Sequence, residues 1–251
     1  MPTTYAHYRF GKDVISALPR PLEKAVENNR ELFDIGLHGP DILFYYKALK
    51  SNPVSGQGYA LHDKMADQFF SHAAEIISKT DDSAAARAYM YGFICHFALD
   101  SECHKYIEKM IQVSGISHSE IEMEFDRYLL TGDHINPVTY FSAKHIHPTM
   151  ENAKVIAPFF EDLSADTVKK ALSSMITYHK LLLAPGQKKS PFSRGSPPGT
   201  RFLRRRQFAH EILTAWELLQ KTSFAAAPSF CPAALHEKWT KYRKTGPYGG
   251  L

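Results

Sequence analysis

The chain has 251 residues, 44% of them hydrophobic and 22% charged, which is ordinary for a soluble globular protein of one or two domains. Its net charge of +4 is mild and comes partly from the basic run at 201–206, so it says little about a nucleic-acid partner. No apolar run approaches the ~20 residues that a membrane span needs, and three cysteines are too few for a disulfide framework.

The N-terminal segment carries no apolar stretch of the kind found in secretory signals, so we expect the protein to remain in a reducing cytoplasm. Apolar residues then follow helical spacing over 11–37, interrupted by Pro19 and Pro21. The following sequence, GLHGPDILF, indicates a turn and then an apolar segment, with Asp41 at or just inside its start. This pattern leaves a helix cap and a functional carboxylate equally open for Asp41.

Residues 51–58 have the composition of a loop, and residues 59–78 show the apolar stripe of an amphipathic helix. His62 and His72 lie near that stripe. Taken alone, each is more typical of a surface or hydrogen-bonded histidine than of a metal ligand.

The next expected helix runs from about residue 84 to Met110 and carries His96, Asp100 and His104 at intervals of four. It is apolar nearly all round, which predicts a central, buried position. A carboxylate seldom enters a core unless it is paired or bound to a metal, because removing its charge from water is costly. A hydrogen-bonded His–Asp pair without metal is the alternative, and the presence of His104 weakens it.

Gly115 is expected to end this helix. The sequence SHSE at 117–120 then matches a capping box, which places His118 in the first turn of a new helix and Glu122 one turn later. The whole series reads H-x3-D-x3-H-x13-H-x3-E. Imidazole and carboxylate groups on single helix faces are what a zinc site in a helical bundle requires, so the series predicts zinc binding.

The rest of the chain shows further helices at 149–160 and from Ser164 or Asp166 to Leu183, with a loop at 131–148 between. His145 and His147 in that loop are interpreted as surface residues or as supports for a site. No segment alternates like a strand, so we expect an all-α fold. After residue 185 the chain is rich in Pro, Gly, Ser and basic residues. We therefore predict a helical domain at 1–185, followed at 186–251 by a linker and a helical extension of unknown role.

These residues resemble a known family. The metal-ligand series, together with the segments TYAHYRFG, LHGPDILFYY and ICHFALDSECH, is similar to the zinc-dependent phospholipase C family, within the phospholipase C and S1/P1 nuclease superfamily. The similarity covers roughly residues 3–185. It implies a multi-helix, all-α bundle that holds a cluster of about two or three zinc ions. It also leaves open whether the amino terminus of the chain is a ligand.

Carried over position by position, the resemblance implies three groups of ligands. One ion would be bound by Asp41, His62 and His96, with His72 in reserve for His62. Asp100 would bridge this ion to a second one, which His7 would also bind. The third ion would be held by His104, His118 and Glu122.

The resemblance implies a phosphodiester hydrolase in which zinc activates water and Asp100 or Asp41 accepts the proton. The implied substrate is a phospholipid or a small-molecule phosphodiester, and peripheral contact with membrane lipid would follow from the former. Two alternatives remain open. One is a nuclease or another soluble phosphodiesterase, for which a base-stacking aromatic cleft would speak. The other is a zinc-stabilised helical module without turnover.

Overall fold

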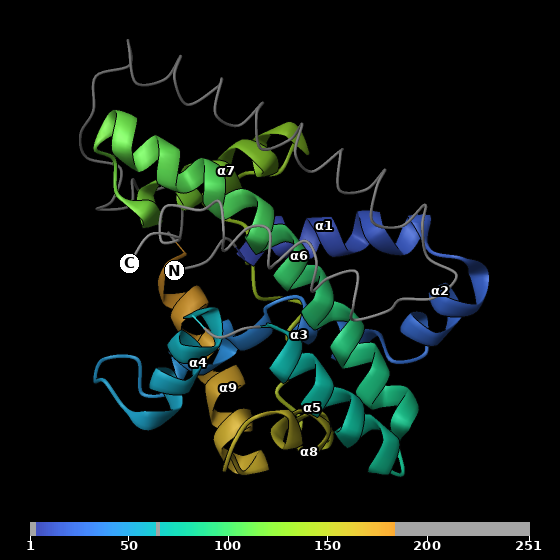
Figure 1. The fold of residues 1–251 in the computed structure, drawn as a ribbon. Coiled ribbons are helices and arrows are strands. Elements are labelled where there is room, and N and C mark those ends of the chain that lie inside the picture. The colour runs from blue at the N-terminus through green and yellow to red at the C-terminus, as the bar shows by residue number, and fades with distance from the viewer. Residues whose placement is uncertain (1–3, 64–65, 184–251) are drawn as a thin grey trace.

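The computed structural model describes residues 4–63 and 66–183, and within these ranges the chain forms helices and no strand, as predicted (Figure 1). The predicted linker and extension at 186–251 lie outside the described residues. The elements are α1 (Thr4–Ala17), α2 (Arg20–Glu27), α3 (Arg30–Gly36), the 3-10 helix η1 (Gly39–Tyr45), α4 (Pro53–Asp63), α5 (Ala66–Lys79), α6 (Ser83–Ser114), α7 (His118–Gly132), α8 (Met150–Ile156), the 3-10 helix η2 (Ala157–Phe159) and α9 (Ala165–Leu181).

The long helix α6 runs through the middle of the molecule, and α1, α3, α5 and α7 pack against it (Figure 1). It begins at an N-cap, Asp82, whose side chain accepts a hydrogen bond from the backbone N–H of Ala85. It ends where Gly115 adopts the left-handed conformation with a φ of 65°, which glycine tolerates without strain. The sequence prediction of a central buried helix ending at Gly115 is confirmed.

The prediction of a loop at residues 51–58 is wrong. The expected loop at 51–58 contains the start of α4, because Asn52 accepts the Ser55 N–H as a cap and Pro53 occupies the first helical position. The described residues of the expected helix at 59–78 are helical, in α4 up to Asp63 and in α5 from Ala66. The composition of the Ser-Asn-Pro sequence indicates a loop, although the same sequence is also a helix start.

Helices α3 and α6 approach each other closely, and two glycines make this contact possible. A Cβ on Gly36 would lie 2.2 Å from the carbonyl oxygen of Tyr89, and a Cβ on Gly92 would lie 2.1 Å from that of Phe33. Any larger residue at these positions would force the backbones apart. The contact holds the chain that follows α3, and therefore η1, next to the middle of α6.

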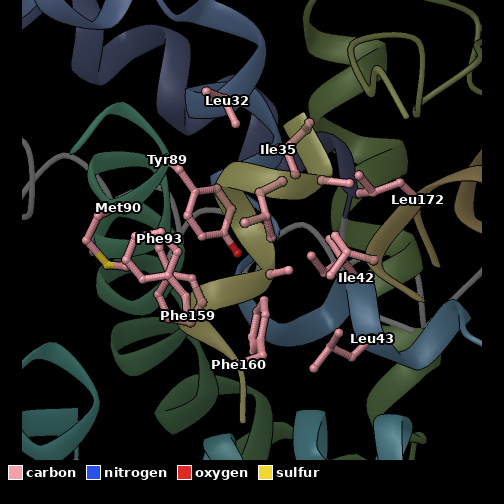
Figure 2. Packing of buried hydrophobic residues seen from close by; sticks show 14 of the residues in the cluster. Leu32, Ile35, Ile42, Leu43, Tyr89, Met90, Phe93, Phe159, Phe160 and Leu172 are labelled. Atoms are coloured by element: carbon pink, nitrogen blue, oxygen red, sulfur yellow. The ribbon is translucent and has the colours of Figure 1, made fainter. Parts of the chain in front are cut away.

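Buried apolar residues form two clusters on either side of this contact. Figure 2 shows the first, in which Tyr89 and Phe93 of α6 face Phe159 and Phe160. The second joins α1 to α6 and α7, and it includes the free thiols of Cys95 and Cys103. Among the described helices, none combines the length and the apolar character that crossing a bilayer requires.

Candidate metal centre

Asp100 lies on α6 in the middle of a group of histidines that come from three different helices. Its Oδ1 atom is 3.1 Å from Nε2 of His7 on α1. Its Oδ2 atom lies 3.4 Å from Nε2 of His96, 3.7 Å from Nε2 of His104 and 3.8 Å from Nε2 of His62. One carboxylate therefore faces four histidines, and each histidine presents its Nε2 atom to it.

A second carboxylate, Asp41, lies beside the same group. It sits in the first turn of η1 and is only 2% exposed. Its Oδ1 atom is 3.1 Å from Nε2 of His62. Ligand atoms of Asp41, His62 and His96 all lie within 4.8 Å of one another, and so do those of His7, His96 and Asp100. His96 belongs to both sets, so the two sets form one continuous centre.

The third set consists of His104, His118 and Glu122, whose ligand atoms also lie within 4.8 Å of one another. His118 and Glu122 are one turn apart on α7, and His118 Nε2 is 2.8 Å from the carboxylate oxygen of Glu122. Ser117 is the N-cap of α7 as expected, but its side chain makes no capping hydrogen bond. With 43% of the His118 side chain exposed, this set is the most open of the three.

The hydrogen bonding of His62 tests whether these residues suit a metal ion. Its Nδ1 atom lies 2.9 Å from the carbonyl oxygen of Gly58, which can only accept, so Nδ1 carries the hydrogen. A ring without a second proton would then point an Nε2 lone pair at the Asp41 carboxylate. Two lone pairs repel unless a proton or a metal ion lies between them. A hydrogen bond that fixes the ring from its far nitrogen is also the usual support of a metal-bound histidine.

Unpartnered buried atoms are consistent with the same interpretation. Among the described residues, Asp41 Oδ1 accepts no hydrogen bond, and Nδ1 of His7 and of His96 lacks a partner. Burying a carboxylate oxygen without a partner is costly, and a cation bound by Asp41 would offset that cost. Imidazole nitrogen together with carboxylate oxygen is a donor set that suits zinc. The residues present therefore fit this ion.

The pKa shifts in the metal-free centre reflect the crowding of charges. Burial lowers the pKa of His96 to about 4. Burial acts in the same direction on His7 and His62, but Asp100 raises the pKa of His7 and Asp41 raises that of His62 to about 9. Burial would raise the pKa of Asp100, yet the surrounding histidines hold it well below its ordinary value. The Asp100 carboxylate thus stays ionised and attracts cations.

A comparison with known protein families agrees with a zinc site. The family model of zinc dependent phospholipase C matches residues 6–177, about two thirds of the chain. The chain belongs to this family. No curated protein and no solved structure matches it.

In this member of the zinc-dependent phospholipase C family, the structure brings together all eight residues that the resemblance nominated. They are His7, Asp41, His62, His96, Asp100, His104, His118 and Glu122. The reserve residue His72 is exposed on α5 and belongs to none of the three sets. The possible amino-terminal ligand belongs to residues 1–3, which lie outside the described part of the chain.

Gly39 shapes the centre through its missing side chain. Its φ is +49°, a conformation that other residues adopt only with strain, and a Cβ there would lie 2.2 Å from Cδ2 of His96. The backbone just before Asp41 can therefore lie directly against the His96 ring. This contact sets the position of η1 relative to α6.

An aromatic stack borders the centre on the α4 side. The ring of Phe44 stacks on Tyr59 at a centroid distance of 4.4 Å and on His62 at 5.6 Å. Tyr59 is 62% exposed. The family member therefore presents an accessible aromatic face close to a candidate ligand.

The interpretation of His145 as a surface residue is wrong, although His147 is indeed largely exposed. His145 is buried, its Nε2 atom lies 2.7 Å from Nε2 of His38, and its ring stacks on Tyr8 at 4.0 Å. Burial lowers the pKa of His145 to about 3 and holds that of His38 well below its ordinary value. The two rings are therefore a neutral hydrogen-bonded pair. The sequence contains no local signal for it, because the partners come from distant segments.

Asp126 was also missed by sequence reasoning. Its carboxylate accepts hydrogen bonds from the backbone N–H groups of Tyr5 and Ala6, and burial raises its pKa to about 7. A signal was present, since Asp126 follows Glu122 at the same interval of four that separates His118 from Glu122.

Proposed function

We propose that this chain is a phospholipase C-like phosphodiester hydrolase that uses a multinuclear zinc centre. The observation that carries the proposal is the position of Asp100, a single carboxylate that faces Nε2 atoms of four histidines. A structural zinc site is usually closed by four ligands around one ion. Three adjoining sets, each with a histidine that faces Asp100, instead match the clustered ions of phosphoryl-transfer enzymes.

The ligands divide among the ions according to the three sets. Asp41, His62 and His96 would hold one ion, while His7 and Asp100 would hold a second. Asp100 would be shared between these two ions, since its Oδ1 faces His7 and its Oδ2 faces His62. A third ion belongs to the set His104, His118 and Glu122.

Zinc bound there would lower the pKa of a water molecule towards neutrality and withdraw charge from the phosphoryl oxygens. The residues of the chain supply the proton acceptor. Asp100 and Asp41 are the candidates, and Asp100 is the more accessible of the two, with 20% of its side chain exposed against 3% for Asp41. The proton passes from water to the carboxylate as the new P–O bond forms. It then neutralises the alkoxide that leaves when the old P–O bond breaks.

A phospholipid is the substrate class that the family supports. Hydrolysis of a phospholipid would bring the protein into peripheral contact with membrane lipid. One observation favours a second candidate, a nucleic acid or another soluble phosphodiester. The exposed Tyr59 ring, backed by Phe44 beside His62, offers a face on which a base can stack.

An assay of three substrates side by side tests the proposal. Zinc-loaded protein is given phosphatidylcholine, bis-p-nitrophenyl phosphate or single-stranded DNA, each with and without a chelator. We expect chelator-sensitive hydrolysis that is fastest with phosphatidylcholine. Faster cleavage of DNA would select the nuclease alternative, and no hydrolysis of any substrate would contradict the enzyme and favour a zinc-stabilised module.

Two histidine variants sharpen the assay. His62→Ala removes a proposed ligand, whereas His72→Ala removes an exposed histidine of the neighbouring helix α5 that belongs to none of the three sets. We expect His62→Ala to lose most of the activity and His72→Ala to keep it. Equal losses in both variants would contradict the assignment of His62.

A further inference from the structure

The first turn of α1 is held by a carboxylate from a different helix. The backbone N–H of Tyr5 donates to Asp126 Oδ2 at 3.0 Å, and that of Ala6 donates to Asp126 Oδ1 at 2.9 Å. Asp126 thus uses both oxygens on two consecutive amides. The residue that follows them is His7, whose Nε2 atom lies 3.1 Å from Asp100.

This arrangement is an N-cap supplied from outside the helix. The first N–H groups of an α-helix have no partner within it, and the helix dipole makes that end electropositive. The first turn of α1 contains no acidic residue of its own. Asp126 meets both needs from α7, because its carboxylate accepts from the backbone N–H groups of Tyr5 and Ala6.

Two other contacts hold the same turn, but through side chains. The Tyr5 hydroxyl donates to Asp133 at 2.6 Å, and Thr4 Oγ1 lies 3.3 Å from Nε2 of His179. Side-chain contacts can be lost while the backbone keeps its course. The two bonds to Asp126 act on the backbone itself, one residue and two residues before His7.

We infer that Asp126 is a positioning residue for the metal centre, which sets His7 in place by fixing the first turn of α1 against α7. The inference rests on the proposed function, because it assigns His7 to the zinc centre. Asp126 also lies one turn beyond Glu122 and two turns beyond His118 on α7. Helix α7, which supplies His118 and Glu122 to the most open set, therefore also positions His7, a proposed ligand of another set.

The test compares zinc affinity in Asp126→Asn and Tyr5→Phe with the full-length wild type, by competition with a chromophoric chelator. The asparagine variant keeps the size of the side chain but presents one acceptor and one NH2 group to two N–H donors. The phenylalanine variant removes the contact with Asp133 and leaves both backbone bonds intact. We expect Asp126→Asn to weaken the binding of one ion by about 10-fold to 100-fold, as losses of supporting groups around metal ligands do. Tyr5→Phe should bind zinc like the wild type.

A double-mutant cycle separates positioning from a general loss of stability. If Asp126 acts through His7, adding Asp126→Asn to His7→Ala should change zinc affinity no further. A purely structural role would weaken binding equally in both backgrounds and would overturn the inference. Equal affinity in the wild type and Asp126→Asn would also overturn it, while leaving the proposed function intact. A wild type that binds no zinc overturns both.

A measurement on the wild type covers the case in which Asp126→Asn does not fold. Amide hydrogen exchange at Tyr5 and Ala6 is followed with zinc and with chelator. Because metal binding at His7 would stabilise the same turn, we expect zinc to slow exchange at these two amides. Exchange at an unchanged rate in both conditions would contradict the inference.

Discussion

The backbone of Gly39 lies against the imidazole ring of His96, so closely that an added Cβ would come within 2.2 Å of the ring atom Cδ2. His96 belongs to two of the three ligand sets, and Gly39 lies two residues before Asp41, a member of one of them. The packing of a residue that carries no side chain is thus directly coupled to the geometry of the candidate centre.

Gly39→Ala should disrupt both the centre and the fold around it. The left-handed conformation costs a residue with a Cβ about 1–2 kcal/mol, and the methyl group would also displace His96. We expect lower thermal stability and weaker zinc binding, measured by calorimetry and chelator competition. Gly56→Ala is the matched control, because no atom lies within 4 Å of its Cβ position in α4. That variant should keep zinc and gain about 0.5–1 kcal/mol.

The core of the centre could be predicted from sequence because its spacing is local. His96, Asp100 and His104 lie on one helix, and so do His118 and Glu122, so that intervals of four place each group on one face. His7, Asp41 and His62 come from other elements, and only the resemblance to a family connected them. The His38–His145 pair and the contacts of Asp126 depend on tertiary packing. Spacing along the chain does not encode them.

The start of α4 shows a different limit of prediction from sequence. The composition of residues 51–58 predicts a loop, because Asn, Pro, Ser and Gly are common in loops. The same residues form a good helix start when Asn caps the helix and Pro follows in its first turn. Composition alone does not distinguish the two, whereas the order Asn-Pro favours the helix.

Gly92→Ala should separate α3 from α6. Its Cβ would lie 2.1 Å from the carbonyl oxygen of Phe33, a backbone atom that cannot move aside as a flexible side chain could. We expect a loss of about 1–3 kcal/mol or more in the free energy of unfolding, measured with urea. Gly132→Ala at the end of α7 has open space around its Cβ position and should change stability little. A Gly92→Ala variant as stable as the wild type would contradict the close helix contact.

The buried His145 should make the metal-free protein sensitive to acid. Burial lowers its pKa in the folded state to about 3, whereas the unfolded chain takes up a proton near the ordinary value of about 6.5. Its contribution to stability is therefore complete above pH 6.5 and is lost as the pH falls from there towards 3. Over this range, the free energy of unfolding falls by about 1.4 kcal/mol per such histidine for each unit by which the pH falls.

Urea unfolding in the presence of a chelator at pH 7.5, 6.5 and 5.5 measures this effect. His145→Gln should lose less stability between pH 6.5 and 5.5 than the wild type does. His147→Gln serves as the control, since 49% of that side chain is exposed. Identical pH profiles for His145→Gln and the wild type would show that His145 is not held neutral.

Zinc binding should release protons near neutral pH. Asp41 raises the pKa of His62 to about 9 in the metal-free centre, so its ring is protonated at pH 7 and must lose that proton to bind an ion. Zinc affinity should therefore rise with pH up to about 9. Calorimetric titrations in two buffers of different ionisation enthalpy count the protons. His62→Ala should release fewer of them than the wild type, and equal release would contradict the role of His62.

The most direct test of the centre is the zinc content of the purified chain after dialysis, compared with that of a His96→Ala, Asp100→Ala, Glu122→Ala triple variant. These three residues between them belong to all three ligand sets. Because the sets adjoin around Asp100, we predict two or more tightly bound zinc ions per chain in the wild type and a large loss in the triple variant. Fewer than two ions in the wild type, or full occupancy in the triple variant, would contradict a multinuclear centre.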